Sequence, residues 1–408
     1  MAWKSRRSSV LDKAKKQGWR QVKFGDVVRQ VKERVDPETS GLERYVAGDH
    51  MDTDDLRIRR WGEIGSGYLG PAFHMRFRPG QVLYGSRRTY LRKVAVADFD
   101  GICANTTFVI EPKNEEELLP EFLPFLMQTD AFNEFSVKNS KGSVNPYINF
   151  SDLARFEFAL PPLEEQRRLV LMLSALEENL VALDSALASA TGLQFSRLEY
   201  AFDSIPDGCL HPVEKLVVTP PRNGLSPKVN ADERGYPTLS ISAVRDGCIV
   251  TEGNIKYAEV TDDQAVAFAL KKDDVLVVRG NGNKLLTGKC GLVDTVPQGC
   301  FYPDLLIRLQ FDSKIIRPQF AALQWNTPST HKRLISRAKS TNGIWKINGG
   351  DIRQHTLKVP PIEEQDALLE EIGAIREART DIERRKVKAQ ALKALALKKI
   401  VGGSSNGV

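Results

Sequence analysis

The chain has 408 residues, 41% of them hydrophobic, so it is longer than the ~100–200 residues of a typical single domain and has enough apolar side chains for two cores. Its 58 basic and 52 acidic residues give a net charge of +6, which excludes a histone-like polycation and is typical of a solvated surface with local basic patches. The five cysteines form no C-x-x-C pair, no apolar run approaches the ~20 residues of a membrane span, and the basic N-terminus has no signal-like apolar core, so we expect reduced thiols in a cytoplasmic protein.

Residues 1–160 are predicted to form a mixed α/β globule that begins with a basic extension over residues 1–18. Short β-rich runs, such as residues 82–84 and 107–110, alternate with Gly, Pro and Asn, as strands joined by turns do. We therefore expect a small domain of strands and short helices.

A long helix is predicted over residues 161–203. Its first turn follows Pro161 and Pro162 and carries two glutamates, and proline and acidic residues are favoured at helix starts. Leucines then recur at alternating spacings of four and three, which is the pattern of a coiled-coil seam. The seam consists of Leu169, Leu173, Leu176, Leu180, Leu183 and Leu187. At 1.5 Å per residue, a run of about 38 residues is a rod of roughly 55 to 60 Å.

The second half of the chain has the same order. Residues 204–359 are predicted to form a second globule, residues 360–401 a second long helix and residues 402–408 a flexible tail. The second seam keeps four apolar positions, at Leu368, Ile372, Ile375 and Ile382. Because a lone helix with one apolar stripe is unstable in water, we expect the two seams to pack on each other as an antiparallel pair between the globules. The predicted fold class is α+β with a pseudo-two-fold internal repeat.

The repeat is visible in the sequence itself. Residues 149–166 match residues 348–365 without a gap at a constant offset of 199, and both end in Pro-Pro-x-Glu-Glu-Gln. Upstream, Gly101 matches Gly299 at an offset of 198, and Val82 matches Val275 at an offset of 193. A loop between these positions therefore differs in length between the copies.

This order of globule, L-P-P-L-E-E-Q, long helix, globule, V-P-P-I-E-E-Q and long helix resembles the specificity subunits of Type I restriction-modification enzymes over essentially the whole chain. The resemblance implies two target recognition domains that each read one half of a split DNA sequence, with the helices as a spacer that docks methyltransferase subunits. It also implies a non-catalytic chain that binds no cofactor, with double-stranded DNA, two methyltransferase subunits carrying S-adenosylmethionine, and restriction or translocase subunits as partners.

Candidate DNA-binding residues lie in two matched pairs of segments. Lys and Arg are needed against phosphates, and planar polar groups are needed at base edges. A polar segment follows residues 82–84, and its aligned counterpart follows residues 274–278; a second pair precedes each Pro-Pro. The candidates are Ser86, Arg87, Arg88, Tyr90, Arg92, Lys141 and Asn145 in the first copy, and Arg279, Asn281, Asn283, Lys284, Lys339, Asn342 and Lys346 in the second.

Two other classes of function remain open. A coiled-coil scaffold with two protein-binding globules would have the same build, and it would bind DNA weakly and without sequence preference. An enzyme is disfavoured because residues 282–290 depart from the phosphate-binding loop pattern and no methyltransferase motif or paired histidines are present. We therefore expect no catalytic and no metal-binding residues.

Overall fold

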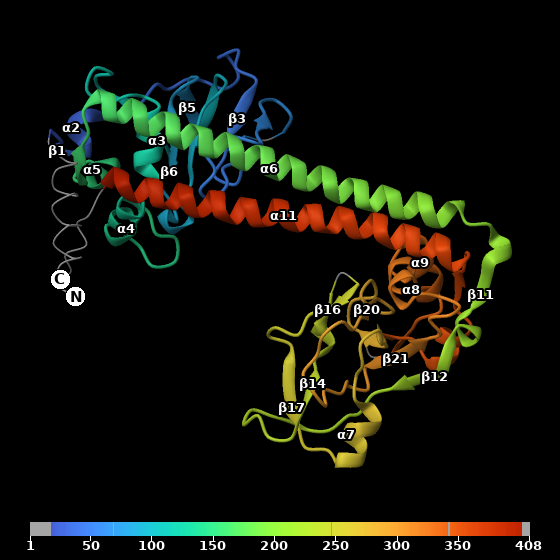
Figure 1. The fold of residues 1–408 in the computed structure, drawn as a ribbon. Helices are drawn as coiled ribbons and strands as arrows, with labels where there is room; N and C mark the ends of the chain where they lie inside the picture. The colour runs from blue at the N-terminus through green and yellow to red at the C-terminus, as the bar shows by residue number, and fades with distance from the viewer. Residues whose placement is uncertain (1–17, 68, 246, 342, 402–408) are drawn as a thin grey trace. The chain divides into compact units, whose positions relative to one another are not determined.

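The computed structural model describes residues 18–401 except 68, 246 and 342, and it divides into two compact units. Unit 1 is Met1–Asp184 with Arg384–Val408, and unit 2 is Ser185–Glu383. Each unit contains a globule of strands and short helices together with parts of two long helices, α6 (Leu163–Ser204) and α11 (Ile362–Val401) (Figure 1). The predicted extension 1–18, apart from its last residue, and the predicted tail 402–408 lie outside the described residues.

The unit 1 globule is built on two four-stranded sheets, ordered β2-β9-β6-β7 and β4-β3-β8-β5, with a two-stranded sheet β1-β10. Residues of β6 and β9 are buried as a continuous apolar run, which is why they form central strands. The elements are β1 (Arg20–Lys23), α2 (Phe24–Val27), β2 (Val28–Val31), β3 (Arg44–Val46), β4 (Gly62–Glu63), β5 (Phe73–Phe77), β6 (Val82–Gly85), η1 (Thr89–Leu91), β7 (Val94–Val96), β8 (Gly101–Ala104), β9 (Thr107–Pro112), α3 (Phe122–Met127), α4 (Asp130–Lys138), α5 (Phe150–Leu153) and β10 (Glu157–Leu160).

The unit 2 globule has a six-stranded sheet, ordered β12-β21-β18-β20-β16-β15, with smaller sheets β13-β17-β14, β19-β23-β22 and β11-β24. Its elements are β11 (Leu210–Pro212), β12 (Val217–Asn223), β13 (Val229–Asn230), β14 (Tyr236–Leu239), β15 (Val244–Arg245), β16 (Cys248–Ile249), β17 (Ile255–Ala258), α7 (Asp262–Phe268), β18 (Val275–Val278), β19 (Gly280–Asn281), β20 (Cys290–Leu292), β21 (Leu306–Phe311), α8 (Pro318–Trp325), α9 (Pro328–Ile335), β22 (Lys339–Thr341), β23 (Ile344–Lys346), α10 (Gly349–Arg353) and β24 (Thr356–Lys358).

The pairing of the central strands follows the sequence repeat to within one residue. Val82 of β6 pairs with Ile110 of β9, and Val275 of β18 pairs with Leu309 of β21. The offset of 193 relates Val82 to Val275, and Leu309 lies one residue beyond the position that the offset of 198 gives for Ile110. The mixed α+β fold class is confirmed, with one globule followed by one long helix in each half of the sequence.

The glutamine that ends each Pro-Pro-x-Glu-Glu-Gln motif is buried, and its side-chain amide forms hydrogen bonds to backbone atoms. Gln166 is fully buried; its Oε1 accepts from the Leu119 amide at 2.9 Å, and its Nε2 donates to the carbonyls of Glu117 and Pro161 at 2.8 Å. Gln365 makes the same kind of contacts in unit 2, to the amide of Arg317 and the carbonyls of Ile315 and Pro360. Each amide ties the first turn of a long helix to the loop that precedes α3 or α8.

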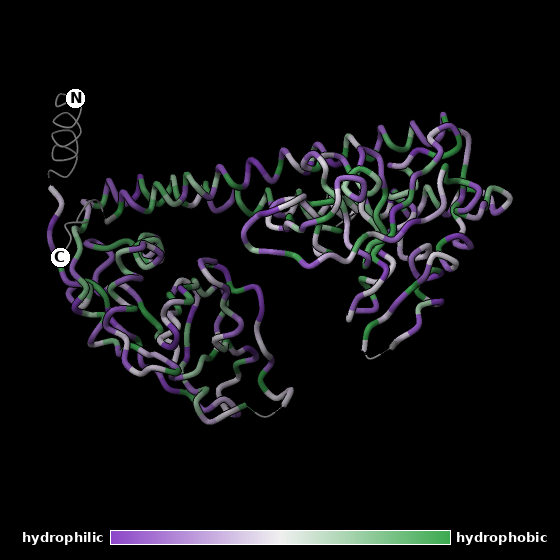
Figure 2. The backbone as a smooth tube through the Cα atoms, turned by 90° about the horizontal axis from the view of Figure 1, so that it is seen from below, coloured by the Kyte–Doolittle hydropathy of each residue, from purple (hydrophilic) through white to green (hydrophobic). Residues whose placement is uncertain are grey.

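The long helices are antiparallel where they meet within each unit (Figure 1). In unit 1, Glu177 and Asp184 of α6 form ion pairs with Lys393 and Lys386 of α11, so rising numbers on one helix meet falling numbers on the other. In unit 2, Arg197 of α6 pairs with Glu371 of α11 at 2.5 Å. Polar and apolar residues are interspersed along the helical segment visible in Figure 2, as expected of an amphipathic helix.

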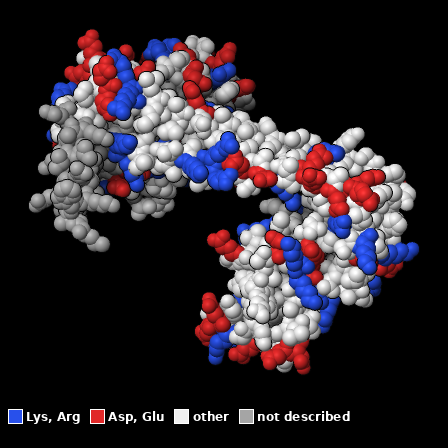
Figure 3. All heavy atoms as spheres, in the orientation of Figure 1, with Lys and Arg blue, Asp and Glu red and all other residues white. Residues whose placement is uncertain are grey.

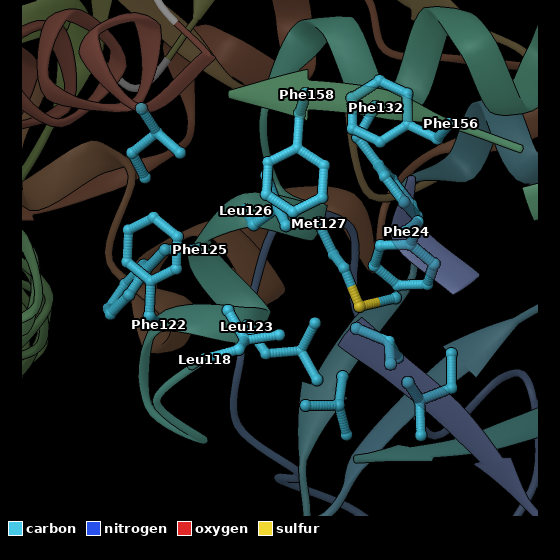
Figure 4. Close-up of a cluster of buried hydrophobic side chains, with 14 of the residues drawn as sticks. Phe24, Leu118, Phe122, Leu123, Phe125, Leu126, Met127, Phe132, Phe156 and Phe158 are labelled. Carbon is cyan, nitrogen blue, oxygen red and sulfur yellow. The ribbon is translucent and has the colours of Figure 1, made fainter. Parts of the chain in front are cut away.

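The seam residues divide into two groups. Leu169 and Leu173 belong to the buried core of unit 1, and Leu368 and Ile372 belong to that of unit 2. Figure 4 shows the aromatic part of the unit 1 core, around Phe132 and Phe156. The remaining seam residues are half-buried: Leu176, Leu180, Leu183, Leu187, Ile375 and Ile382. The start of each long helix is therefore part of a globule core as well as of a helix pair.

Candidate nucleic-acid interface

In unit 1, the two candidate segments are joined by backbone hydrogen bonds. The Ile148 amide donates to the Ser86 carbonyl at 3.0 Å, and the Arg88 amide donates to the Pro146 carbonyl at 2.6 Å. Tyr147 forms isolated bridges with Arg87 and with Lys141. The loop after β6 and the segment before α5 thus form one surface.

The same arrangement recurs in unit 2. The Ile347 amide donates to the Arg279 carbonyl at 2.9 Å, and β19 pairs with β23 so that Gly280 faces Lys346 and Asn281 faces Trp345. Arg279 and Ile347 are the repeat equivalents of Ser86 and Ile148. We call these two surfaces the unit 1 interface (residues 86–93 and 138–147) and the unit 2 interface (residues 279–287, 337–341 and 343–346).

The unit 1 interface exposes planar polar groups and cations. Arg87, Arg88 and Tyr90 are exposed, and the Arg87 guanidinium carbon lies 5.8 Å from the centroid of the Tyr147 ring. Arg88 Nε donates to Asn145 Oδ1 at 3.3 Å, which brings a guanidinium and a carboxamide together. These are groups that contact phosphates and base edges.

Lys141 is exposed but paired. Its Nζ lies 2.9 Å from Asp152 Oδ2, and this hydrogen bond holds the pKa of the Asp152 carboxyl below its ordinary value. A phosphate bound by Lys141 would therefore compete with Asp152.

Two of the unit 1 candidates point into the protein. Ser86 is buried, and its Oγ donates to the Thr106 carbonyl at 2.7 Å. Arg92 donates to Asp54, to Asp130 and, over 2.6 Å, to the Gln128 carbonyl. These two residues shape the loop and leave its outward face to their neighbours.

The loop between Ser86 and Lys93 contains two non-glycine residues with a left-handed backbone conformation. Arg88 and Arg92 have φ angles of 50° and 51°, in the left-handed region that non-glycine residues rarely adopt. They bracket the short turn η1, and Thr89 within that turn contacts Ser140 through a hydroxyl pair at 2.9 Å. A backbone of this kind persists when surrounding contacts fix it, which here are those of Arg92 and Thr89.

In unit 2, two lysines face each other across a hairpin. Lys339 of β22 and Lys346 of β23 are register partners and both are exposed. Directly opposed like charges destabilise a strand pair, so a bound anion would relieve their repulsion. Lys284 lies over the ring of Trp345, the residue before Lys346, with its Nζ 4.3 Å from the ring centroid.

The remaining unit 2 candidates are largely occupied by contacts within the protein. Arg279 is half-buried and donates to the Asp304 carbonyl at 3.4 Å. The Oδ1 atoms of Asn281 and Asn283 each accept a backbone amide of their own loop. Asn342 lies outside the described residues.

Sequence reasoning missed the apolar part of both surfaces. Tyr147 and Trp345 lie against the candidate cations, and Leu285 and Leu286 are exposed beside Lys284. The sequence feature that could have indicated them is an apolar residue between polar ones in a loop that carries lysines.

The visible face of each unit carries both signs of charge. Figure 3 shows Lys and Arg interspersed with Asp and Glu on the visible face of each unit. Within the described residues, no group of three or more His, Cys, Asp or Glu side chains could hold a metal ion. The cysteines are free thiols, and burial raises the pKa of Cys103 and of Cys300 to about 12. No helix among the described residues is long and apolar enough to cross a membrane.

Comparison with known proteins assigns a class to this architecture. Residues 67–188, which include the unit 1 interface, match the family model of the Type I restriction modification DNA specificity domain. A solved structure from work on complex assembly and conformational transition of the type I R-M system is similar, with a TM-score of 0.62 at 21% identity over 95% of this chain and 98% of the other. The S subunit from M. genitalium is similar at a TM-score of 0.57 and 14% identity, over 95% and 97% of the two chains. The fold is therefore that of Type I specificity subunits.

The sequence comparison agrees with the fold. The chain is 32% identical over 157 residues to the EcoKI specificity subunit of Escherichia coli K12, covering 38% of this chain and 33% of that protein. It is 32% identical over 120 residues to the EcoDI specificity subunit of Escherichia coli, covering 28% and 26%. These matches span about a third of the curated relatives or less. The resemblance indicated by the repeated motif is confirmed: the chain is similar to Type I restriction-enzyme specificity subunits in sequence over these segments and in fold over nearly its whole length.

Proposed function

We propose that this chain is the DNA-specificity subunit of a Type I restriction-modification complex and reads a split target, one half with each unit. The observation that carries the proposal is the pair of equivalent interfaces, joined by the same backbone hydrogen bond at Ile148 and at Ile347. Both interfaces expose cations and lie at repeat-related positions. Two similar surfaces with different side chains suit two half-sites of different sequence.

The chemistry of each interface supports a mixture of phosphate and base contacts. Arg87, Arg88 and Asn145 offer planar hydrogen-bonding groups in unit 1. Lys339 and Lys346 offer paired point charges in unit 2, which favour phosphates. Sequence discrimination would come from the planar groups, and much of the affinity from the lysines.

Reaction chemistry would come from partner subunits. Exposed apolar side chains on the helices, including Leu171 of α6 and Leu395 of α11, offer docking surface for methyltransferase subunits. The internal repeat favours two such subunits, with S-adenosylmethionine bound by them, and restriction or translocase subunits joining for cleavage. A complex of this kind acts on the chromosome, so we place it in the cytoplasm.

The test is a methylome. Long-read sequencing of cells that express this chain with its neighbouring methyltransferase should show methylated adenine in a split motif, and the motif should vanish when the chain is deleted. Arg87→Ala with Arg88→Ala should relax only one half of that motif, and Lys339→Ala with Lys346→Ala should weaken methylation without changing its sequence. An unchanged methylome without the chain, in cells where the methyltransferase is active, would show that it is a scaffold.

A further inference from the structure

Two leucines project from the unit 2 interface. Leu285 is 66% exposed and Leu286 is 49% exposed, in the loop between β19 and β20. Exposed leucines are unfavourable in water, so a pair of them on a loop that follows a candidate DNA-contacting strand requires an explanation.

The loop that carries them is held firmly. Its end is fixed by the Gly288 amide, which donates to the Val278 carbonyl at 2.8 Å, and by Trp325 Nε1, which donates to the Gly288 carbonyl at 2.8 Å. Thr287 is fully buried, and its carbonyl contacts His331 Nε2 at 2.8 Å. The exposure of the leucines is therefore a property of a fixed loop.

The polar side chains of the loop hold its shape. Asn281 Oδ1 accepts from the Asn283 amide at 2.8 Å, and Asn283 Oδ1 accepts from the Leu285 amide at 2.9 Å. Lys284 lies over the Trp345 ring. An asparagine that reads adenine uses its Oδ1 and Nδ2 together, and these two have committed Oδ1 to the backbone. Asn283 is exposed as well, but its Oδ1 is bonded to the loop, and the two leucines are the exposed side chains that make no hydrogen bond.

The lysines nearby identify the occupant as DNA. Gly280, which leads into this loop, faces Lys346 across β19 and β23, and Lys346 faces Lys339. Two opposed cations indicate a polyanionic partner. Within a DNA groove the apolar group that distinguishes one base from the others is the C5 methyl of thymine, in the major groove.

We propose that Leu285 and Leu286 are specificity-determining residues that contact thymine methyl groups in the half-site read by unit 2. The proposal rests on the proposed function and goes further, because it names the base and the groove. It assigns part of sequence reading in unit 2 to apolar contact, whereas unit 1 exposes Arg87 and Arg88 in the loop after the equivalent strand, β6.

The experiment replaces each thymine of both half-sites, one at a time, by deoxyuridine, which lacks only the methyl group. Affinity is measured at fixed salt with the full-length chain in complex with its methyltransferase subunits. At least one replacement should weaken binding about fourfold, the factor expected for one buried methyl group. In the L285A/L286A variant, binding to the thymine duplex should be weaker by a similar factor or more, and the same replacement should have no further effect.

Val266→Ala is the matched control, because Val266 lies on α7 of the same unit and is 78% exposed. It should leave both the affinity and the deoxyuridine effect unchanged. The inference would be overturned if, at every thymine of both half-sites, deoxyuridine replacement changed the affinity equally in the wild type and in the L285A/L286A variant. That result would leave the split-site function intact. A leucine variant that only impairs assembly with the methyltransferase would likewise overturn the inference. Absence of any sequence preference in the wild-type complex would instead overturn the proposed function.

Discussion

Arg92 donates from its guanidinium to the Asp130 carboxylate over 3.0 Å, which ties the loop of the unit 1 interface to the start of α4. Arg92→Met should loosen this loop and weaken specific DNA binding about tenfold, a cost of ~1.4 kcal/mol. Because Arg92 faces inward, the slope of log affinity against log salt should not change. Arg88→Ala removes an exposed cation from the interface and should lower that slope by about 1.

Arg76→Met is the control for Arg92, because Arg76 pairs with Asp100 at 2.6 Å in the same globule. It should leave DNA affinity unchanged. If Arg92→Met reduces the salt slope as Arg88→Ala does, Arg92 contacts DNA directly. Its hydrogen bonds to Asp54 and Asp130 would then be broken in the DNA complex.

The facing lysines of the unit 2 hairpin should have opposite effects on stability and on binding. Lys346→Gln removes the repulsion from Lys339, so the free energy of unfolding of the DNA-free chain should rise by about 0.3 kcal/mol. The same change should lower the salt slope of DNA binding by about 1. Chemical denaturation and binding titrations measure the two effects, and a loss of stability would show that no repulsion exists.

His355 should make unit 2 sensitive to acid. It is 3% exposed, its ring lies 4.7 Å from the Trp325 ring, and burial lowers its pKa to about 3. The unfolded state therefore binds a proton below about pH 6.5 that the folded state does not, so stability is complete above that pH and falls as the pH drops towards 3. At pH 4.5 the loss should be roughly 2.7 kcal/mol.

Trp fluorescence during denaturation at a series of pH values tests this. His355→Phe should flatten the pH dependence, and His211→Gln, at an exposed position of β11, should not. An unchanged slope in His355→Phe would assign the acid sensitivity to other groups.

The ion pair between Glu177 of α6 and Lys393 of α11 is largely buried, with side chains 19% and 11% exposed. Lys393→Met leaves a carboxylate without its partner and should destabilise unit 1 by about 3 kcal/mol. Glu177→Leu combined with Lys393→Met should recover most of that loss. A double-mutant cycle on the free energy of unfolding measures the coupling, and strictly additive effects would contradict it.

The sequence predicted the long helices and the mixed globules because these depend on local patterns. Pro-Pro followed by acids starts a helix, and spacings of three and four continue it. It did not predict which seam residues enter the globule core, since Leu169 and Leu173 meet partners that are distant in sequence.

For the candidate site, the sequence predicted which segments contribute but not how their side chains are oriented. Charge and polarity located both loops, but whether Arg92 faces out or in depends on Asp54 and Asp130, which no local pattern reveals. The leucines of unit 2 were missed because a search for DNA contacts favours charged residues.

The buried glutamines have a consequence for how such a protein can change. The partners of Gln166 and Gln365 are main-chain atoms, an amide and two carbonyls in each unit. Because these hydrogen bonds involve only main-chain atoms of the neighbouring loop, they do not depend on which side chains that loop carries. Substitutions in that loop that keep its backbone would therefore leave this joint in place, while Leu169 and Leu173 in unit 1, and Leu368 and Ile372 in unit 2, attach the helix start through side-chain packing. The motif that reveals the repeat in the sequence thus supplies one side-chain-independent joint between helix and globule in each unit.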